Sequence, residues 1–122
     1  MRKKIVSILF LFCFIGNQTE IKANEITIGI ALGFTGPTES IAPSMASSAE
    51  LAISEANSSK IFLNGEEKIN LIKIDTMCDK SQIKSINNTI NKNNIIAIIG
   101  AACPGISEGI LLGSVNEKNI PM

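Results

Sequence analysis

The chain contains no histidine, tryptophan or tyrosine. Without histidine it cannot build a Ser-His-Asp triad or a Cys-His pair, and the usual zinc sites would lack their imidazole ligands. Only two aromatic side chains, Phe34 and Phe62, lie beyond the first 23 residues, too few for a platform on which nucleic-acid bases stack. These absences argue against a triad hydrolase, a common type of zinc enzyme and a nucleic-acid-binding protein, and we expect no cofactor.

The N-terminus has the pattern of a secretory leader. Three basic residues, Arg2, Lys3 and Lys4, precede an apolar run over residues 5–16, which is shorter than the roughly 20 residues that a membrane span needs. We therefore predict a signal peptide over residues 1–23, cleaved near Ala23, with a retained signal anchor as the alternative. Without this leader the chain keeps 7 basic and 10 acidic residues, a net charge of −3, which again disfavours a nucleic-acid surface.

The remaining residues, 24–122, alternate between strand and helix patterns. Ile26, Ile28 and Ile30 alternate with Thr27 and Gly29, as in a strand. The predicted strands cover residues 26–32, 69–74 and 95–99, with another beginning at Ile120 and a short extended piece at 61–63; the predicted helices cover residues 43–59, 81–90 and 106–116. Strand and helix in strict alternation predict an α/β fold with a doubly wound parallel sheet.

Ligands of such sheets bind outside the carboxyl ends of the strands, where the loops 33–43, 75–80 and 100–107 should meet. The glycines of the first loop lack the spacing of a dinucleotide fingerprint, so we expect them to shape the turn. The third loop leads into a helix, where backbone N–H groups could meet an anion, although all such folds have helix N-termini there. Asp75 and Asp79 could form a catalytic acid pair, but helix capping or solvated loop charge is the simpler interpretation.

Cys13 lies inside the predicted leader, which leaves Cys78 and Cys103, each just beyond a predicted strand. They could be free core thiols, a redox pair or a structural bridge. They do not form a C-x-x-C motif, which disfavours redox chemistry, and export to an oxidising compartment favours the bridge. Such a bridge would tie two loops of the expected ligand edge together.

Several segments in order resemble the periplasmic binding proteins of branched-chain amino-acid ABC transporters, the leucine/isoleucine/valine-binding type. The segments that carry the likeness are Ile26-Thr27-Ile28-Gly29-Ile30 with Thr35-Gly36-Pro37, Ala52-Ile53-Ser54-Glu55-Ala56-Asn57, Ile74-Asp75-Thr76-Met77-Cys78-Asp79 and Ile98-Ile99-Gly100-Ala101-Ala102-Cys103. The resemblance implies a type I periplasmic binding protein, with two α/β lobes around a cleft. The chain would supply most of the first lobe, and the second lobe would be missing.

The resemblance also implies site residues. In the family, the cysteines that match Cys78 and Cys103 form a disulfide, and the loop after the second cysteine holds the ligand's carboxylate, usually through serine. Here Pro104 and Gly105 stand at that place and offer no hydroxyl. Ser40 and Ile41 match the loop that covers the ligand. The implied ligand contacts are Ser40, Ile41, Cys103, Pro104 and Gly105.

The function that we expect from these observations is capture of an amino acid or a related small organic solute in the periplasm, for delivery to the membrane permease of an ABC transporter. The same fold would also suit a ligand-sensing domain of a receptor or regulator. An exported hydrolase or redox protein is the enzyme alternative, but no nucleophile elbow or histidine supports it. We therefore expect a binding protein and not an enzyme.

Overall fold

The computed structural model describes residues 24–59 and 66–122, so the predicted leader and the predicted extended piece at 61–63 lie outside the described residues. The elements follow one another as β1 (Asn24–Leu32), α1 (Ala42–Ser59), β2 (Glu67–Asp75), η2 (Lys80–Gln82), α2 (Ile83–Lys92), β3 (Ala97–Gly100), α3 (Pro104–Ile110), η3 (Leu111–Val115) and α4 (Asn116–Lys118). Of the two elements labelled η, η2 is a 3-10 turn and η3 is a turn of π-helix.

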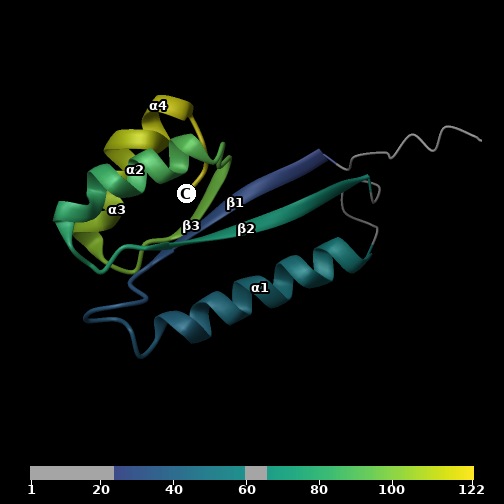
Figure 1. The fold of residues 1–122 in the computed structure, drawn as a ribbon, viewed down its shortest axis with the longest axis horizontal. Coiled ribbons are helices and arrows are strands. Elements are labelled where there is room, and N and C mark those ends of the chain that lie inside the picture. The colour runs from purple at the N-terminus through teal and green to yellow at the C-terminus, as the bar shows by residue number, and fades with distance from the viewer. Residues whose placement is uncertain (1–23, 60–65) are drawn as a thin grey trace, which may run out of the picture.

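The strands form a parallel sheet in the order β2-β1-β3. Leu32 lies opposite Asp75, and Ala31 lies opposite Gly100, so all three strands end at the same edge of the sheet. Helix α1 covers one face, whereas α2 and α3 cover the other (Figure 1). This arrangement confirms the predicted doubly wound α/β fold, because helices follow parallel strands and pack on both faces.

The core beneath α1 is small. It consists of Ile30 and Leu32 of β1 and of Ala42 and Ala46 of α1, all about 1% exposed. The short alanine side chains let the helix approach the sheet closely. Beside this core, Lys73 Nζ of β2 lies 2.6 Å from Glu50 Oε1 of α1 and 6.0 Å from the centre of the Phe34 ring, which links strand, helix and first loop.

The larger core lies beneath α2 and α3 and is built mainly from isoleucine. Its buried members are Ala31, Ile74, Ile86, Ile90, Ile95, Ile98, Ile106, Ile110 and Val115. Helix α2 is rich in asparagine, a weak helix former, and it buries Ile86 and Ile90 four residues apart on one side. Packing of that side on the sheet, more than intrinsic propensity, therefore stabilises α2.

The two helices on this face approach each other along three glycines spaced four residues apart, Gly105, Gly109 and Gly113. A Cβ added at these positions would meet the side chains of Lys80, Ile83 and Asn87 respectively. Asn87 also donates from Nδ2 to the Gly109 carbonyl, at 3.3 Å, and accepts at Oδ1 from the Ser114 N–H, at 3.1 Å. The glycines therefore provide the space in which the α3–η3 segment packs against η2 and α2, a contact that the sequence pattern did not predict.

Several predicted boundaries are wrong. The third strand begins at Ala97 and not at Ile95, because the Ile95 N–H bonds to the Ile90 carbonyl (3.2 Å) as α2 ends. The second helix starts with the 3-10 turn η2, and the third begins at Pro104 and continues as the π-helical η3.

The strand that we predicted at Ile120 is also absent from the described chain, since residues 120–122 belong to no regular element. One hydrogen bond, from the Ile98 N–H to the Pro121 carbonyl (3.0 Å), nevertheless holds this segment beside β3.

Candidate functional site

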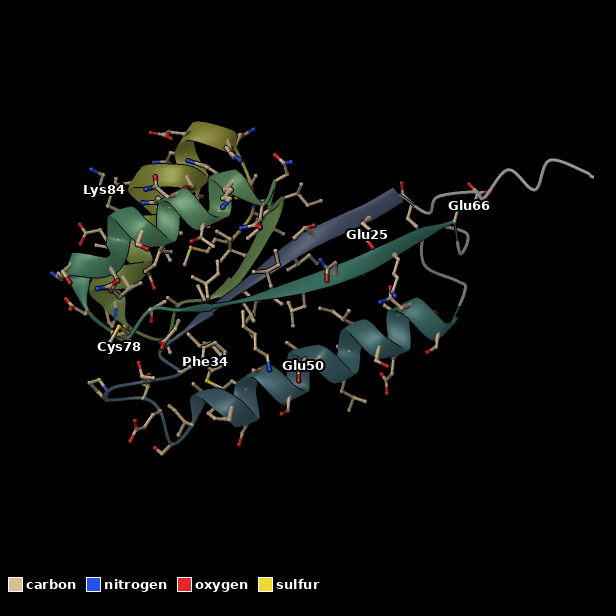
Figure 2. The ribbon with its side chains drawn as sticks, viewed as in Figure 1. Glu25, Phe34, Glu50, Glu66, Cys78 and Lys84 are labelled. Atoms are coloured by element: carbon tan, nitrogen blue, oxygen red, sulfur yellow. A yellow bond between two sulfur atoms is a disulfide. The ribbon has the colours of Figure 1, made fainter. Side chains whose placement is uncertain are left out.

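The loops that follow β1, β2 and β3 meet at the carboxyl edge of the sheet, as the parallel register requires. In Figure 2, Cys78 marks the end of the molecule where these loops gather, and Phe34 lies near it. In open α/β sheets this edge is where ligands bind. The site is therefore described from these three loops, which cover residues 33–41, 76–79 and 101–103.

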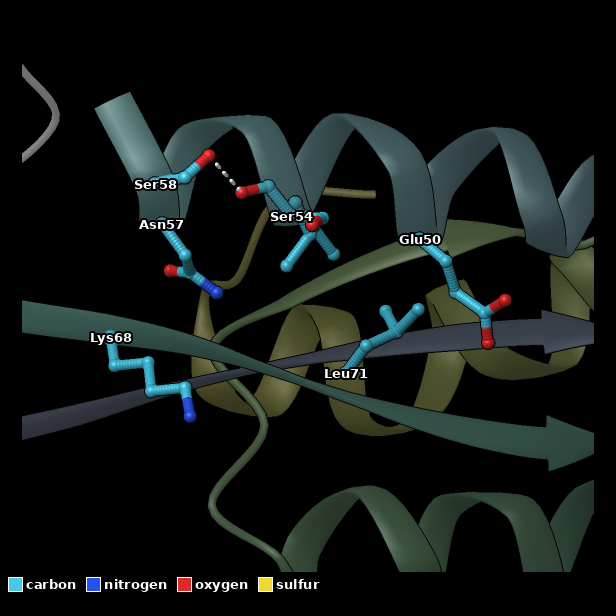
Figure 3. Close-up of a pocket in the computed structure, with 7 residues that line it drawn as sticks. Glu50, Ser54, Asn57, Ser58, Lys68 and Leu71 are labelled. Carbon is cyan, nitrogen blue, oxygen red and sulfur yellow. Dashed lines mark hydrogen bonds between the residues drawn. The ribbon is translucent and has the colours of Figure 1, made fainter. Parts of the chain in front are cut away.

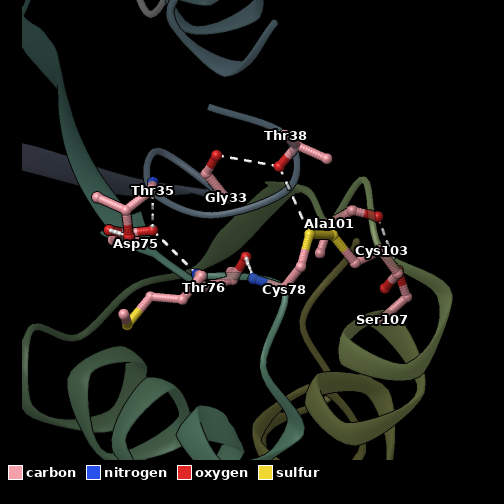
Figure 4. The surroundings of a disulfide bond; sticks show 10 residues. Gly33, Thr35, Thr38, Asp75, Thr76, Cys78, Ala101, Cys103 and Ser107 are labelled. Carbon is pink, nitrogen blue, oxygen red and sulfur yellow. Dashed lines mark hydrogen bonds between the residues drawn. A yellow bond between two sulfur atoms is a disulfide. The ribbon is translucent and has the colours of Figure 1, made fainter. Parts of the chain in front are cut away.

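A disulfide between Cys78 and Cys103 joins the second and third loops, with the two Cα atoms 5.7 Å apart (Figure 4). Because β1 lies between β2 and β3, the bridge passes beside the end of β1. A Cβ added to Gly33, just after β1, would lie 3.2 Å from Cys78 Sγ. The predicted bridge is confirmed. Because Gly33 has no side chain, the Cys78 sulfur can lie beside it.

The first loop is fixed to this bridge by Thr38. The Thr38 hydroxyl lies 3.0 Å from the Gly33 carbonyl, to which it donates, and 3.5 Å from Cys78 Sγ (Figure 4). Gly36 in the same loop has φ +84°, and a Cβ there would lie 2.8 Å from the Met77 carbonyl. A glycine at this position therefore shapes the turn, as we predicted, and lets the first and second loops approach closely.

Asp75 binds the first loop to the second. Its carboxylate accepts hydrogen bonds from the Thr35 hydroxyl (2.8 Å), the Thr35 N–H (3.3 Å) and the Met77 N–H (3.0 Å). Desolvation, the largest single effect, raises the pKa of Asp75, but the hydrogen bonds from Met77 and Thr35 together lower the pKa below its ordinary value. The ionised carboxylate is thus the form that holds the two loops together.

Asp79 acts within its own loop. It is the N-cap of η2, and its carboxylate accepts from the Ser81 N–H (2.8 Å) and the Ser81 hydroxyl (2.7 Å). The hydrogen bond from the Ser81 backbone is the main cause that lowers the pKa of Asp79, followed by that from the Ser81 side chain. Both aspartates therefore brace loops, which agrees with the simpler of our two interpretations.

The five residues that we predicted to contact a ligand fall into two groups. Ser40 and Ile41 lie exposed in the turn before α1, where the Ile41 side chain keeps 52% of its surface. Cys103 is the N-cap residue of α3, and Pro104 and Gly105 form its first turn. Within residues 24–59 and 66–122 no hydrogen bond joins the two groups directly, and the path between them runs through Thr38 and the disulfide.

Gly105 does not face open space. A Cβ at this position would lie 3.1 Å from Lys80 Nζ and closer still to Lys80 Cε, so the lysine stem crosses the glycine. The hydroxyl that follows in the sequence, that of Ser107, donates to the Ala101 carbonyl at 2.8 Å (Figure 4). Ser107 thus fixes the third loop from within. The sequence did not predict the roles of Thr35, Thr38 and Ser107, because a hydroxyl that hydrogen-bonds within a loop leaves no regular spacing in the sequence.

A hollow of about 420 Å³ lies elsewhere, between α1 and β2. Its lining residues are Glu50, Ile53, Ser54, Asn57, Ser58, Lys68 and Leu71 (Figure 3). None of these seven residues belongs to the loops at the carboxyl edge, so this groove is separate from the candidate site.

The described residues contain no group of three or more His, Cys, Asp or Glu side chains placed to hold a metal ion. None of the helices in the described part of the chain is long and apolar enough to cross a membrane.

Among solved structures, this fold matches a fragment of a type I periplasmic binding protein lobe. The branched-chain amino acid transporter substrate-binding protein LivJ from Streptococcus pneumoniae, solved in complex with isoleucine, aligns over 80% of this chain with 19% identity and a TM-score of 0.70. A possible leucine/isoleucine/valine-binding protein from Rhodopirellula baltica aligns over 87% with 16% identity and a TM-score of 0.72.

The aligned part is 28% of the length of each of these two proteins. No protein-family model matches the chain, and no curated protein matches it. At these identities the comparison shows the fold, which is the one that the sequence resemblance implied.

Proposed function

We propose that this chain forms most of the first lobe of an exported solute-binding protein. In this proposal residues 1–23 are a signal peptide and residues 24–122 contribute one wall of a cleft in the periplasm. The protein captures an amino acid or a related small organic solute and delivers it to the permease of an ABC transporter. No bond is made or broken in this role, so we propose a binding protein and not an enzyme.

The observation that carries the proposal is the construction of the carboxyl edge. A disulfide, the Thr38 hydroxyl and the Asp75 carboxylate fix three loops against one another at the place where open α/β sheets bind ligands. Fixed loops lower the entropy cost of binding, because the protein needs little ordering when the solute arrives. The shared fold with two substrate-binding proteins supports the same conclusion.

We propose Ser40, Ile41, Cys103, Pro104 and Gly105 as the ligand contacts on this lobe. Pro104 has no N–H to donate, and neither Pro104 nor Gly105 has a hydroxyl with which to hold a carboxylate. Among the five proposed contacts the Ser40 hydroxyl is then the side-chain group for polar contact, and the exposed Ile41 offers apolar contact.

Isothermal titration calorimetry of the full-length protein without its leader tests the proposal. The panel should contain aliphatic, polar and acidic L-amino acids and small organic acids without an amino group. We expect one solute class to bind with one molecule per protein. Absence of binding across the whole panel would contradict the proposal.

A matched pair of variants tests the site itself. Ile41 and Ile96 are equally exposed, at 52% and 51%, but Ile41 precedes α1 near the carboxyl edge and Ile96 precedes β3 at the opposite end. Full burial of an isoleucine side chain is worth about 1.5–3 kcal/mol, and Ile41 has about half of its surface left to bury, so Ile41→Ala should weaken binding about 3-fold to 10-fold. Ile96→Ala should bind as the parent does, and equal effects of the two changes would remove Ile41 from the site.

A further inference from the structure

The outer edge of β2 carries an asparagine side chain in the place of a neighbouring strand. Asn57, near the end of α1, donates from Nδ2 to the Ile69 carbonyl at 2.9 Å. It also accepts at Oδ1 from the Ile69 N–H at 2.8 Å. The amide group thus satisfies both backbone groups of Ile69, as a residue of a paired strand would do.

The direction of the other backbone groups of β2 follows from this contact. Backbone groups alternate along a strand, and the Thr76 N–H, just beyond β2, bonds to the Leu32 carbonyl at the end of β1. Even-numbered residues therefore point toward β1, and odd-numbered residues, Leu71 and Lys73 among them, point away from it. The groove between α1 and β2 runs beside this outer edge, and Asn57 and Leu71 both line it (Figure 3).

Among the described residues no strand pairs with the outer edge of β2. An unpaired strand edge is a template for another strand, and a second copy of β2 fits this one. Antiparallel pairing centred on Asn70 places Glu67 of each copy opposite Lys73 of the other, and Ile69 opposite Leu71. Both cross-strand charge pairs are then of opposite sign, and the two apolar pairs lie between them. The register is self-complementary, as a two-fold contact requires.

We propose that Asn57 closes the outer edge of β2 against the addition of a second copy of this chain. Because Asn57 occupies both backbone groups of Ile69, a second strand can pair in this register only after displacing the amide. This role is independent of solute binding, since the edge is separate from the loops at the carboxyl ends of the strands.

Light scattering coupled to size-exclusion chromatography tests the proposal on the full-length protein over a concentration series. Asn57→Ala should shift from the monomer mass toward twice that mass as concentration rises, whereas the parent stays monomeric. Asn93→Ala is the matched control, because Asn93 also ends a helix but its amide bonds only to Thr89 of the same helix, at 2.8 Å. A folded, monomeric Asn57→Ala variant at every concentration would overturn the proposal.

The register has its own test. In the Asn57→Ala background, Lys73→Glu should suppress the dimer, since it places glutamates opposite each other, and adding Glu67→Lys should restore it. Both variants lose the contact between Lys73 and Glu50, so a difference between their dimer fractions reports the charge pairing between the two copies of β2. Equal dimer fractions in the two variants would contradict the register.

Hydrogen exchange in the parent protein keeps the proposal testable if Asn57→Ala does not fold. We expect the Ile69 amide to exchange at least tenfold more slowly than those of Leu71 and Lys73. Equal protection of all three amides would mean that something other than Asn57 covers the edge, and the proposal would be wrong.

Discussion

Replacement of Gly109 by alanine tests the contact between α2 and α3. A Cβ at this position would lie 2.7 Å from Cγ1 and 2.9 Å from Cγ2 of Ile83. Both atoms are bonded directly to the Ile83 Cβ, so they cannot move aside without a change of rotamer or a shift of the helix. The substitution therefore forces α2 and α3 apart.

Two effects of opposite sign set the magnitude. Overpacking of a well-packed contact costs typically 1–3 kcal/mol, whereas exchange of glycine for alanine inside a helix gains about 1 kcal/mol. We expect Gly109→Ala to lower the free energy of unfolding by about 1 kcal/mol. Gly105→Ala is the control, since the added Cβ would meet the mobile end of Lys80, and we expect no loss of stability from it.

Urea denaturation followed by circular dichroism, on the full-length protein, gives the free energies. A double-mutant cycle with Ile83→Ala isolates the contact, because truncation of Ile83 removes the atoms that the new methyl group would meet. In that background Gly109→Ala should stabilise the protein. If Gly109→Ala stabilises the parent protein as well, the close helix contact is not the reason for glycine at this position.

Three other changes have expected outcomes. Cys78→Ser combined with Cys103→Ser should lower the free energy of unfolding by about 3–4 kcal/mol, because the bridge closes a loop of 25 residues. In a urea titration, reduction of the parent protein should lower its free energy of unfolding to the same value. Equal stability of the oxidised parent and the variant would contradict a stabilising bridge. Asp75 has a lowered pKa, so its ionised form stabilises the folded protein above the ordinary value of 3.8, and this stability is lost as pH falls through the lowered pKa. The loss on acidification should therefore be smaller in Asp75→Asn than in the parent, and identical pH profiles of unfolding would refute the role of its hydrogen bonds. Glu50→Gln should lower the free energy of unfolding by less than about 1 kcal/mol, because the Lys73 and Glu50 side chains are about half exposed, at 50% and 46%. A larger loss in the same assay would contradict a solvated ion pair.

Much of the fold could be predicted from the sequence because its signals are local. Alternation of isoleucine with small or polar residues in β1 predicts a strand with two different faces, and the structure places Ile30 beneath α1 and Ala31 beneath α2 and α3. The continuous apolar run from Ile95 to Ile99 predicts a strand buried on both faces, and this prediction is wrong for the described residues, where Ile98 is buried but Ile99 keeps 43% of its surface. The run also does not show where the strand begins. The start at Ala97 depends on a hydrogen bond between Ile95 and the end of α2, which is a tertiary contact.

The packing of the three glycines in the α3–η3 segment is also a tertiary contact that the sequence did not predict. Gly105, Gly109 and Gly113 are visible in the sequence at intervals of four, yet their spacing does not say which helix lies against them. The structure shows that their neighbours are Lys80, Ile83 and Asn87 respectively. The π-helical turn at residues 111–115, which contains Gly113, was also not predicted, since no residue pattern distinguishes it from a continued helix.

At the candidate site the sequence predicted the position of the loops, from the predicted strand order, and the cysteine bridge, from the predicted export. It did not predict the hydroxyls of Thr35 and Thr38, whose partners are 40 residues away in the chain. Contacts of this separation depend on the finished fold.

Amide hydrogen exchange of the full-length protein, with and without its bound solute, tests the central claim most directly. The account predicts that the solute protects residues 34–41 and 101–106, in the loops fixed by the disulfide and Thr38, and leaves the groove between α1 and β2 unchanged. Protection confined to the groove, with unchanged exchange in both loops, would contradict the claim that the carboxyl edge of this sheet is the binding site.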